Sequence, residues 1–163
     1  MSKLYPIGIQ NFESLRKDGY LYVDKTRLIY QLVKTGRYYF LSRPRRFGKS
    51  LLISTLEAYY QGKKELFEGL SIEQLEKDWI KHPILHLDLN IEKYDTPESL
   101  DHILNDNLEH WESLYGTRPS EVSFSLRLAG IIQRAYEQTG QRLVILVDEY
   151  DKPMLQTFDK PDL

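Results

Sequence analysis

Residues 40–51 read FLSRPRRFGKSL, and this stretch decides the fold of the 163-residue chain. Residues 37–41, which overlap the start of this stretch, include a continuous rather than alternating apolar run at 38–41, which predicts a strand covered on both faces. Residues 49–60 predict a helix, because their apolar side chains recur at helical spacing. A Gly-Lys-Ser sequence that joins a buried strand to a helix lies where a phosphate-binding loop belongs.

Each residue type in this loop has a chemical reason to bind a nucleotide. Gly48 lets the backbone approach phosphate oxygens, and successive amides near it form an anion-binding concavity. Lys49 reaches the β- and γ-phosphates, and Ser50 ligates Mg²⁺. The predicted ATP-binding residues are Arg46, Phe47, Gly48, Lys49, Ser50 and Leu51.

The loop departs from the usual pattern at its start. In G-x-x-x-x-G-K-[ST] the first glycine precedes Gly48 by five residues, and here Arg43 stands at that position. Three arginines, at positions 43, 45 and 46, have three candidate roles: to add charge at the phosphates, to act as an arginine finger in cis, or to contact a polyanion outside the pocket.

A second motif strengthens the nucleotide interpretation. Five aliphatic residues, 143–147, precede Asp148 and Glu149, and this sequence resembles a Walker B strand. A buried strand would hold Asp148 at the carboxyl edge of the sheet, where its charge holds Mg²⁺. Glu149 is the candidate base that orients and deprotonates the attacking water, with Lys49 as the other catalytic residue.

The rest of the chain predicts helices between strands, and hence an α/β fold with a parallel sheet flanked by helices. The predicted strands are 37–41, 84–90 and 143–147, with 84–90 at a sheet edge because its two faces differ in polarity. The predicted helices are 25–34, 49–60, 71–79, 96–114 and 120–138.

Composition and charge exclude several classes of protein. The chain has no cysteine, which removes disulfides and metal–thiolate sites, and its longest aliphatic run is too short to span a membrane. The first ten residues do not resemble a secretory signal either, so with no membrane span we expect a cytoplasmic protein without a membrane partner. Eight basic residues and no acidic one lie between Asp24 and Glu57, so this segment is built to meet an anion.

Three sets of residues resemble a family of predicted prokaryotic AAA-ATPase-like proteins. They are the Tyr-Val-Asp-Lys-Thr stretch at 22–26, the loop at 42–50, in which an arginine-proline pair replaces the first glycine, and the strand ends at 84–88 and 148–151. The resemblance covers nearly all of the chain. It implies a single P-loop NTPase domain over residues 1–163, with ATP and Mg²⁺ bound by Lys49, Ser50, Asp148 and Glu149.

The resemblance also implies that this chain is the N-terminal portion of a longer protein. Relatives continue through a sensor strand, which lies between the strand before the loop and the Asp148 strand, and often into a restriction-endonuclease-like nuclease domain. Three functions stay open: an ATPase that drives a partner or an appended domain, a nucleotide-binding module without hydrolysis, and a nucleic-acid-binding fragment that uses the basic stretch 25–49.

Overall fold

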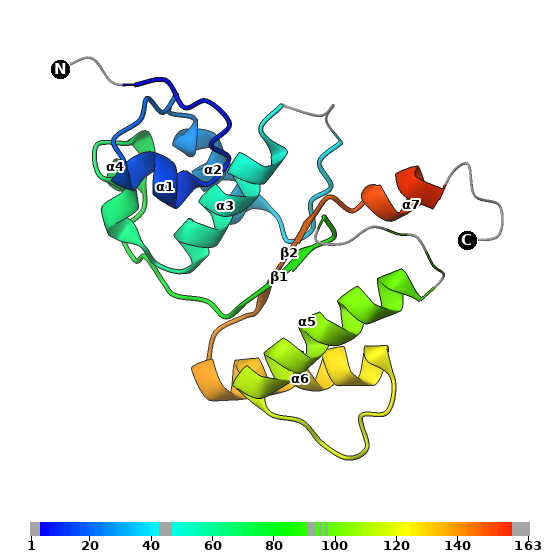
Figure 1. Cartoon of the computed structure of the whole chain (residues 1–163). Coiled ribbons are helices and arrows are strands. Elements are labelled where there is room, and N and C mark those ends of the chain that lie inside the picture. The colour runs from blue at the N-terminus through cyan, green and yellow to red at the C-terminus, as the bar shows by residue number, and fades with distance from the viewer. Residues whose placement is uncertain (1–3, 43–46, 91–93, 95, 97, 158–163) are drawn as a thin grey trace. The chain divides into compact units, whose positions relative to one another are not determined.

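The computed structural model describes residues 4–42, 47–90, 94, 96 and 98–157. The chain divides into two compact units, Met1–Lys81 and His82–Leu163, which are described separately. The first unit is helical and the second is a mixed helix and strand unit (Figure 1).

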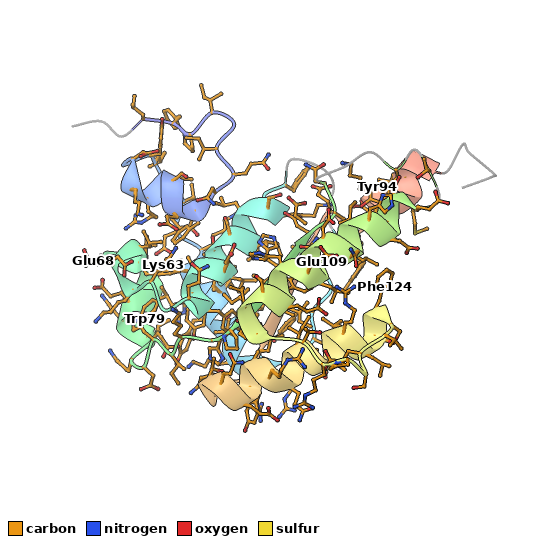
Figure 2. The ribbon with its side chains drawn as sticks, turned by 60° about the horizontal axis from the view of Figure 1, so that its bottom comes forward. Lys63, Glu68, Trp79, Tyr94, Glu109 and Phe124 are labelled. Atoms are coloured by element: carbon orange, nitrogen blue, oxygen red, sulfur yellow. The ribbon has the colours of Figure 1, made fainter. Side chains whose placement is uncertain are left out.

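The described residues of the first unit form the helices α1 (Phe12–Lys17), α2 (Thr26–Thr35), α3 (Lys49–Tyr60) and α4 (Ser71–Leu75) and the 3-10 turn η1 (Lys64–Phe67). Its core is aromatic. The ring of Phe67 lies 4.9 Å from that of Phe12 and 5.0 Å from that of Trp79, a residue labelled in Figure 2. Phe12 and Phe67 are fully buried, so this cluster is the packing centre of the helices.

Three helices were predicted in this unit, and the structure contains all three, one of them shorter than predicted. The helix 49–60 is confirmed residue for residue as α3, and the helix 25–34 is found one residue later as α2. The helix predicted over 71–79 ends at Leu75, where α4 gives way to extended backbone at Glu76. Helix α1 was not predicted; Asn11 begins it by accepting a hydrogen bond from the Ser14 amide at 2.9 Å.

The strand predicted over 37–41 is wrong as a description of the structure. These residues form no regular strand, and Tyr38 and Phe40 are largely exposed. The Tyr39 hydroxyl instead donates to the Leu32 carbonyl at 2.6 Å, which ties the segment back to α2. An apolar run becomes a strand only where another strand pairs with it, and in the described residues the two strands pair with each other.

The second unit contains the sheet. Strands β1 (Ile84–Asp88) and β2 (Val144–Asp148) are parallel, and the connection between them carries helices α5 (Ser99–Tyr115) and α6 (Phe124–Thr139). A short helix, α7 (Lys152–Thr157), follows β2. Strands joined by helical crossovers confirm the predicted α/β class and the parallel pairing.

Helices α5 and α6 pack on β1 through a compact apolar cluster. Leu85 of β1 is fully buried against Leu108 and Trp111 of α5 and Ile131 of α6. The side chain of Ser123 caps α6, so this helix begins four residues after the predicted Ser120, and Gly140 ends it as expected. Among the described residues, no helix combines the length and the apolar character needed to cross a bilayer.

Candidate functional site

The Gly48-Lys49-Ser50 sequence lies at the beginning of α3. Gly48 is the N-cap and has a left-handed backbone, with φ +75° and ψ +27°, and its carbonyl accepts from the Leu52 amide at 3.0 Å. Lys49 and Ser50 form the first turn, where helix amides have no intrahelical acceptor and the helix dipole favours an anion. The structure therefore places Lys49 and Ser50 at the kind of helix end that binds phosphate.

Gly48 is needed here for its conformation. A Cβ built on Gly48 would meet no atom within 4 Å, so the space above this residue is open. The left-handed backbone is strained for other residues. Phe47 is 63% exposed and Leu51 is half-buried, while Arg46 and the preceding residues 43–45 lie outside the described residues.

The acidic pair lies at the end of β2, as predicted. Asp148 is the last residue of the strand and is 9% exposed, and its Oδ1 accepts from the Glu149 amide at 2.9 Å. Glu149 has a φ of +54°, a left-handed conformation that costs roughly 1 kcal/mol for a residue other than glycine. The chain thus turns sharply after β2, and the Lys152 amide then donates to the Glu149 carbonyl at 3.0 Å.

The register of the sheet adds a residue that sequence reasoning did not assign. Asp88, the last residue of β1, pairs with Asp148, the last residue of β2. The available signal was the shared pattern of an apolar strand ending in aspartate at both 84–88 and 144–148.

The candidate residues belong to two separately described units. Phe47, Gly48, Lys49, Ser50 and Leu51 lie in the first unit, and Asp148 and Glu149 lie in the second. The convergence of Lys49 and Ser50 with the two acids on one triphosphate stays a prediction.

The 22–26 stretch has a packing role that the structure makes explicit. One carboxylate oxygen of Asp24 accepts from the Thr26 amide and hydroxyl, and the other accepts from the Ser71 amide and hydroxyl, at 2.6–2.9 Å. Desolvation acts to raise the pKa of Asp24, but the hydrogen bonds from Ser71 and Thr26 outweigh it and hold the pKa at about 2. Asp24 therefore joins the beginnings of α2 and α4.

The donor set of the candidate residues fits Mg²⁺. The described residues contain no group of three or more His, Cys, Asp or Glu side chains that could enclose a metal ion. Mg²⁺ does not require one, because it usually keeps several waters and takes one or two carboxylates together with substrate phosphates. The Ser50 hydroxyl and the Asp148 carboxylate are hard oxygen ligands of this kind.

Comparison with known proteins gives a family match over almost the whole chain. The model of a family described as "Predicted AAA-ATPase" matches residues 6–163. An "Uncharacterized protein in vnfD 5'region" from Azotobacter chroococcum mcd 1 is 39% identical over 163 residues, which cover 99% of this chain and 31% of that protein. The chain thus spans about a third of the length of this relative. No solved structure matches.

Proposed function

This chain belongs to the predicted AAA-ATPase family, and from that premise we propose that it binds ATP with Mg²⁺ and hydrolyses it. The observation that carries the proposal is the left-handed Gly48 at the beginning of α3, followed directly by Lys49 and Ser50. A phosphate-binding loop requires this arrangement of glycine, lysine and hydroxyl at a helix N-terminus.

In this proposal the residues at the beginning of α3 bind the triphosphate. The amides from Phe47 to Leu51 donate to phosphate oxygens, and the Lys49 ammonium neutralises charge on the β- and γ-phosphates. The Ser50 hydroxyl and the Asp148 carboxylate hold Mg²⁺, which supplies charge stabilisation as the γ-phosphoryl group is transferred.

Glu149 has the role of general base. Its carboxylate orients the attacking water and accepts its proton, a task that requires correct placement because phosphoryl transfer depends mainly on positioning. The left-handed backbone of Glu149 supports this role, since strained residues concentrate at functional sites. We further propose that hydrolysis drives the remainder of a longer protein or a partner.

Thermal unfolding of the purified chain with and without Mg-ATP tests nucleotide binding. A ligand that binds only the folded state stabilises it, by about 2.7 kcal/mol at a hundredfold excess over its Kd. We expect Mg-ATP to raise the melting temperature of the wild type and Lys49→Ala to abolish the rise. The control is Lys64→Ala in η1, an exposed lysine of the same unit, which should keep the rise.

Hydrolysis is tested separately with Glu149→Gln. This variant should keep the ATP-dependent rise in melting temperature and release phosphate at least tenfold more slowly than the wild type. The exposed Glu68→Gln is the matched control. A wild type that binds ATP but releases no phosphate would leave a nucleotide-binding module without hydrolysis, and a wild type that ignores ATP would contradict the proposal as a whole.

A further inference from the structure

We propose that Trp79 is a releasable anchor in the connection between the two units. In the seated state its ring packs against Tyr59 and Phe67 while its backbone is strained. Release relaxes the backbone, exposes the indole N–H to water and frees residues 79–81 to extend, so that the connection between the units lengthens. This device does not depend on the proposed nucleotide binding.

The first observation is the backbone conformation of Trp79. Its φ is +44°, and the other residue besides glycine with a positive φ, among the described residues, is Glu149. Bulky side chains are rare in this region because their Cβ crowds the neighbouring carbonyl oxygen. A residue strained in this way persists only where its surroundings hold it, and such residues concentrate at switch regions and functional sites.

The second observation is the indole N–H of Trp79, a residue labelled in Figure 2. Its Nε1 atom is buried and has no hydrogen-bond acceptor in the part of the chain that the structure describes. The neighbouring Tyr59 hydroxyl, by contrast, donates to the Glu76 carboxylate. A buried donor without an acceptor is unfavourable, because in water it would form a hydrogen bond. The seated state therefore has two unfavourable features at one residue, and release removes both.

Aromatic packing opposes this release. The centroid of the Trp79 ring lies 5.8 Å from that of Tyr59 and 5.0 Å from that of Phe67. The backbone is also closely packed, since a Cβ built on Gly62 would lie 3.0 Å from the Trp79 carbonyl oxygen. Ring burial thus favours the seated state, whereas strain and the unpaired N–H favour the released state. Opposing contributions at one residue make two populated states possible.

Trp79 also lies where such a change would have an effect beyond its own surroundings. On one side of it, the Glu76 carboxylate accepts from the Asp78 amide at 3.1 Å. On the other side, the Pro83 carbonyl accepts from the Val144 amide at 2.9 Å, which ties the chain to the sheet. The two units divide within this interval. Release of the ring would therefore free the connection between these hydrogen bonds without breaking either of them.

The alternative is that Trp79 is a static packing residue whose strain is the cost of filling the aromatic core. The two roles predict different behaviour of the unliganded protein. A static residue has one environment until the whole unit unfolds. A releasable anchor has a second, water-exposed environment that is populated while the rest of the fold is intact.

Fluorine NMR of the chain labelled with fluorotryptophan tests this directly, because its two tryptophans are Trp79 and Trp111. Trp111, which is buried against Leu85, is the internal control. The resonances are assigned with Trp79→Phe and Trp111→Phe. We expect Trp79 to show a second resonance, or relaxation dispersion from a state populated at about 1% or more, and Trp111 to show neither. The indole ¹H–¹⁵N signals of protein without fluorine provide the same comparison.

Two glycine variants test what holds the ring in place. Gly62 and Gly69 have nearly the same left-handed φ, +70° and +73°, but a Cβ on Gly69 would meet no atom within 4 Å. Alanine at either position therefore adds similar backbone strain, while only Gly62→Ala presses on the Trp79 carbonyl. We expect Gly62→Ala to raise the released population by about threefold or more relative to the wild type, and Gly69→Ala to leave it unchanged.

Several results would overturn the proposal. A single sharp Trp79 resonance without dispersion, in both the wild type and Gly62→Ala, would show a static residue. A minor state that Trp111 shares at the same population would be global unfolding. An indole N–H of Trp79 that exchanges slowly with water in every variant would show that the group is permanently protected, and equal shifts in the two glycine variants would contradict the role of the Gly62 contact.

Discussion

Gly48 and Gly140 have nearly the same left-handed backbone, with φ of +75° and +66°, and a Cβ on either residue would meet no atom within 4 Å. Gly48 begins α3 and Gly140 ends α6. Alanine at either position should therefore cost a similar amount of stability, about 1 kcal/mol, from backbone strain alone. Comparing the two alanine variants therefore separates the stability lost through backbone strain from any loss of ligand binding.

We predict that Gly48→Ala sharply weakens the Mg-ATP response while Gly140→Ala leaves it unchanged. The measurement is the rise in melting temperature on adding Mg-ATP, compared after each variant's own loss of stability is subtracted. Equal responses in the two variants would show that the backbone at Gly48 is not used to bind phosphate.

Glu76 is the other single residue whose environment makes a definite prediction. It is 4% exposed, and its carboxylate accepts from the Tyr59 hydroxyl, the Lys34 ammonium and the amides of Lys77 and Asp78. Burial acts to raise the pKa of Glu76, but the hydrogen bonds from Tyr59 and Lys34 lower it to about 2. Glu76 thereby connects the end of α2 with the end of α3.

The lowered pKa predicts acid sensitivity. Because the folded-state pKa lies below the ordinary 4.5, Glu76 stabilises the fold fully above about pH 4.5 and loses this contribution as the pH falls toward 2. The contribution is on the order of 2–3 kcal/mol. Urea unfolding at pH 7 and pH 3 should show a smaller acid-induced loss for Glu76→Gln than for the wild type. The exposed Glu68→Gln should match the wild type, and an identical pH dependence in all three would refute the assignment.

Among the elements, the α5–α6 hairpin depends on one arginine. The Arg134 guanidinium forms an ion pair with Glu121 and donates to the carbonyls of Tyr115 and Gly116, at 3.2 and 2.6 Å. Gly130 leaves room for this pair, since a Cβ there would lie 2.0 Å from Glu121 Oε1. The pair fixes the loop that joins the two helices.

Arg134→Met should therefore lower the stability of the chain by more than the loss of a single ion pair, because Arg134 also donates hydrogen bonds to two carbonyls. It would remove the ion-pair partner of Glu121 and the donor that Arg134 supplies to the carbonyls of Tyr115 and Gly116, and we expect the melting temperature to fall by roughly 5 °C or more. Arg142→Met, which changes an exposed arginine of the same unit, should have little effect. Similar melting temperatures for the two variants would mean that the loop is held by other contacts.

The elements that the sequence predicts well are those whose signal is local. Helix α3 has apolar residues at helical spacing and a left-handed glycine at its start. Helix α6 ends at Gly140, as expected because a left-handed glycine commonly terminates a helix. The strand predicted at 37–41 depended on pairing partners, and no local pattern can supply those. The start of α6 was predicted at Ser120, but the side chain of Ser123 accepts from the Leu126 amide and caps the helix three residues later.

At the scale of the whole molecule, the sequence predicts which element each motif residue lies on better than it predicts which elements come together, and the site itself stays a prediction. Gly48, Lys49 and Ser50 at a helix start, and Asp148 at a strand end, are where their motifs put them. The position of Asp88 beside Asp148 needed the strand register, which is set by packing against α5 and α6 across 55 residues of intervening chain. A motif determines the local backbone around its own residues, whereas the pairing of strands far apart in sequence is determined by how the core packs.

The register of β1 and β2 determines both the packing of the apolar core and the positions of the aspartates at the strand ends. Sliding β1 by one residue would turn Leu85 away from Leu108, Trp111 and Ile131, and the same slide would remove Asp88 from its place beside Asp148. Packing of the β1 leucines against α5 and α6 thus fixes the register that pairs Asp88 with Asp148. A substitution in the core around Leu85 could therefore also displace the two aspartates at the strand ends, including Asp148, the proposed Mg²⁺ ligand.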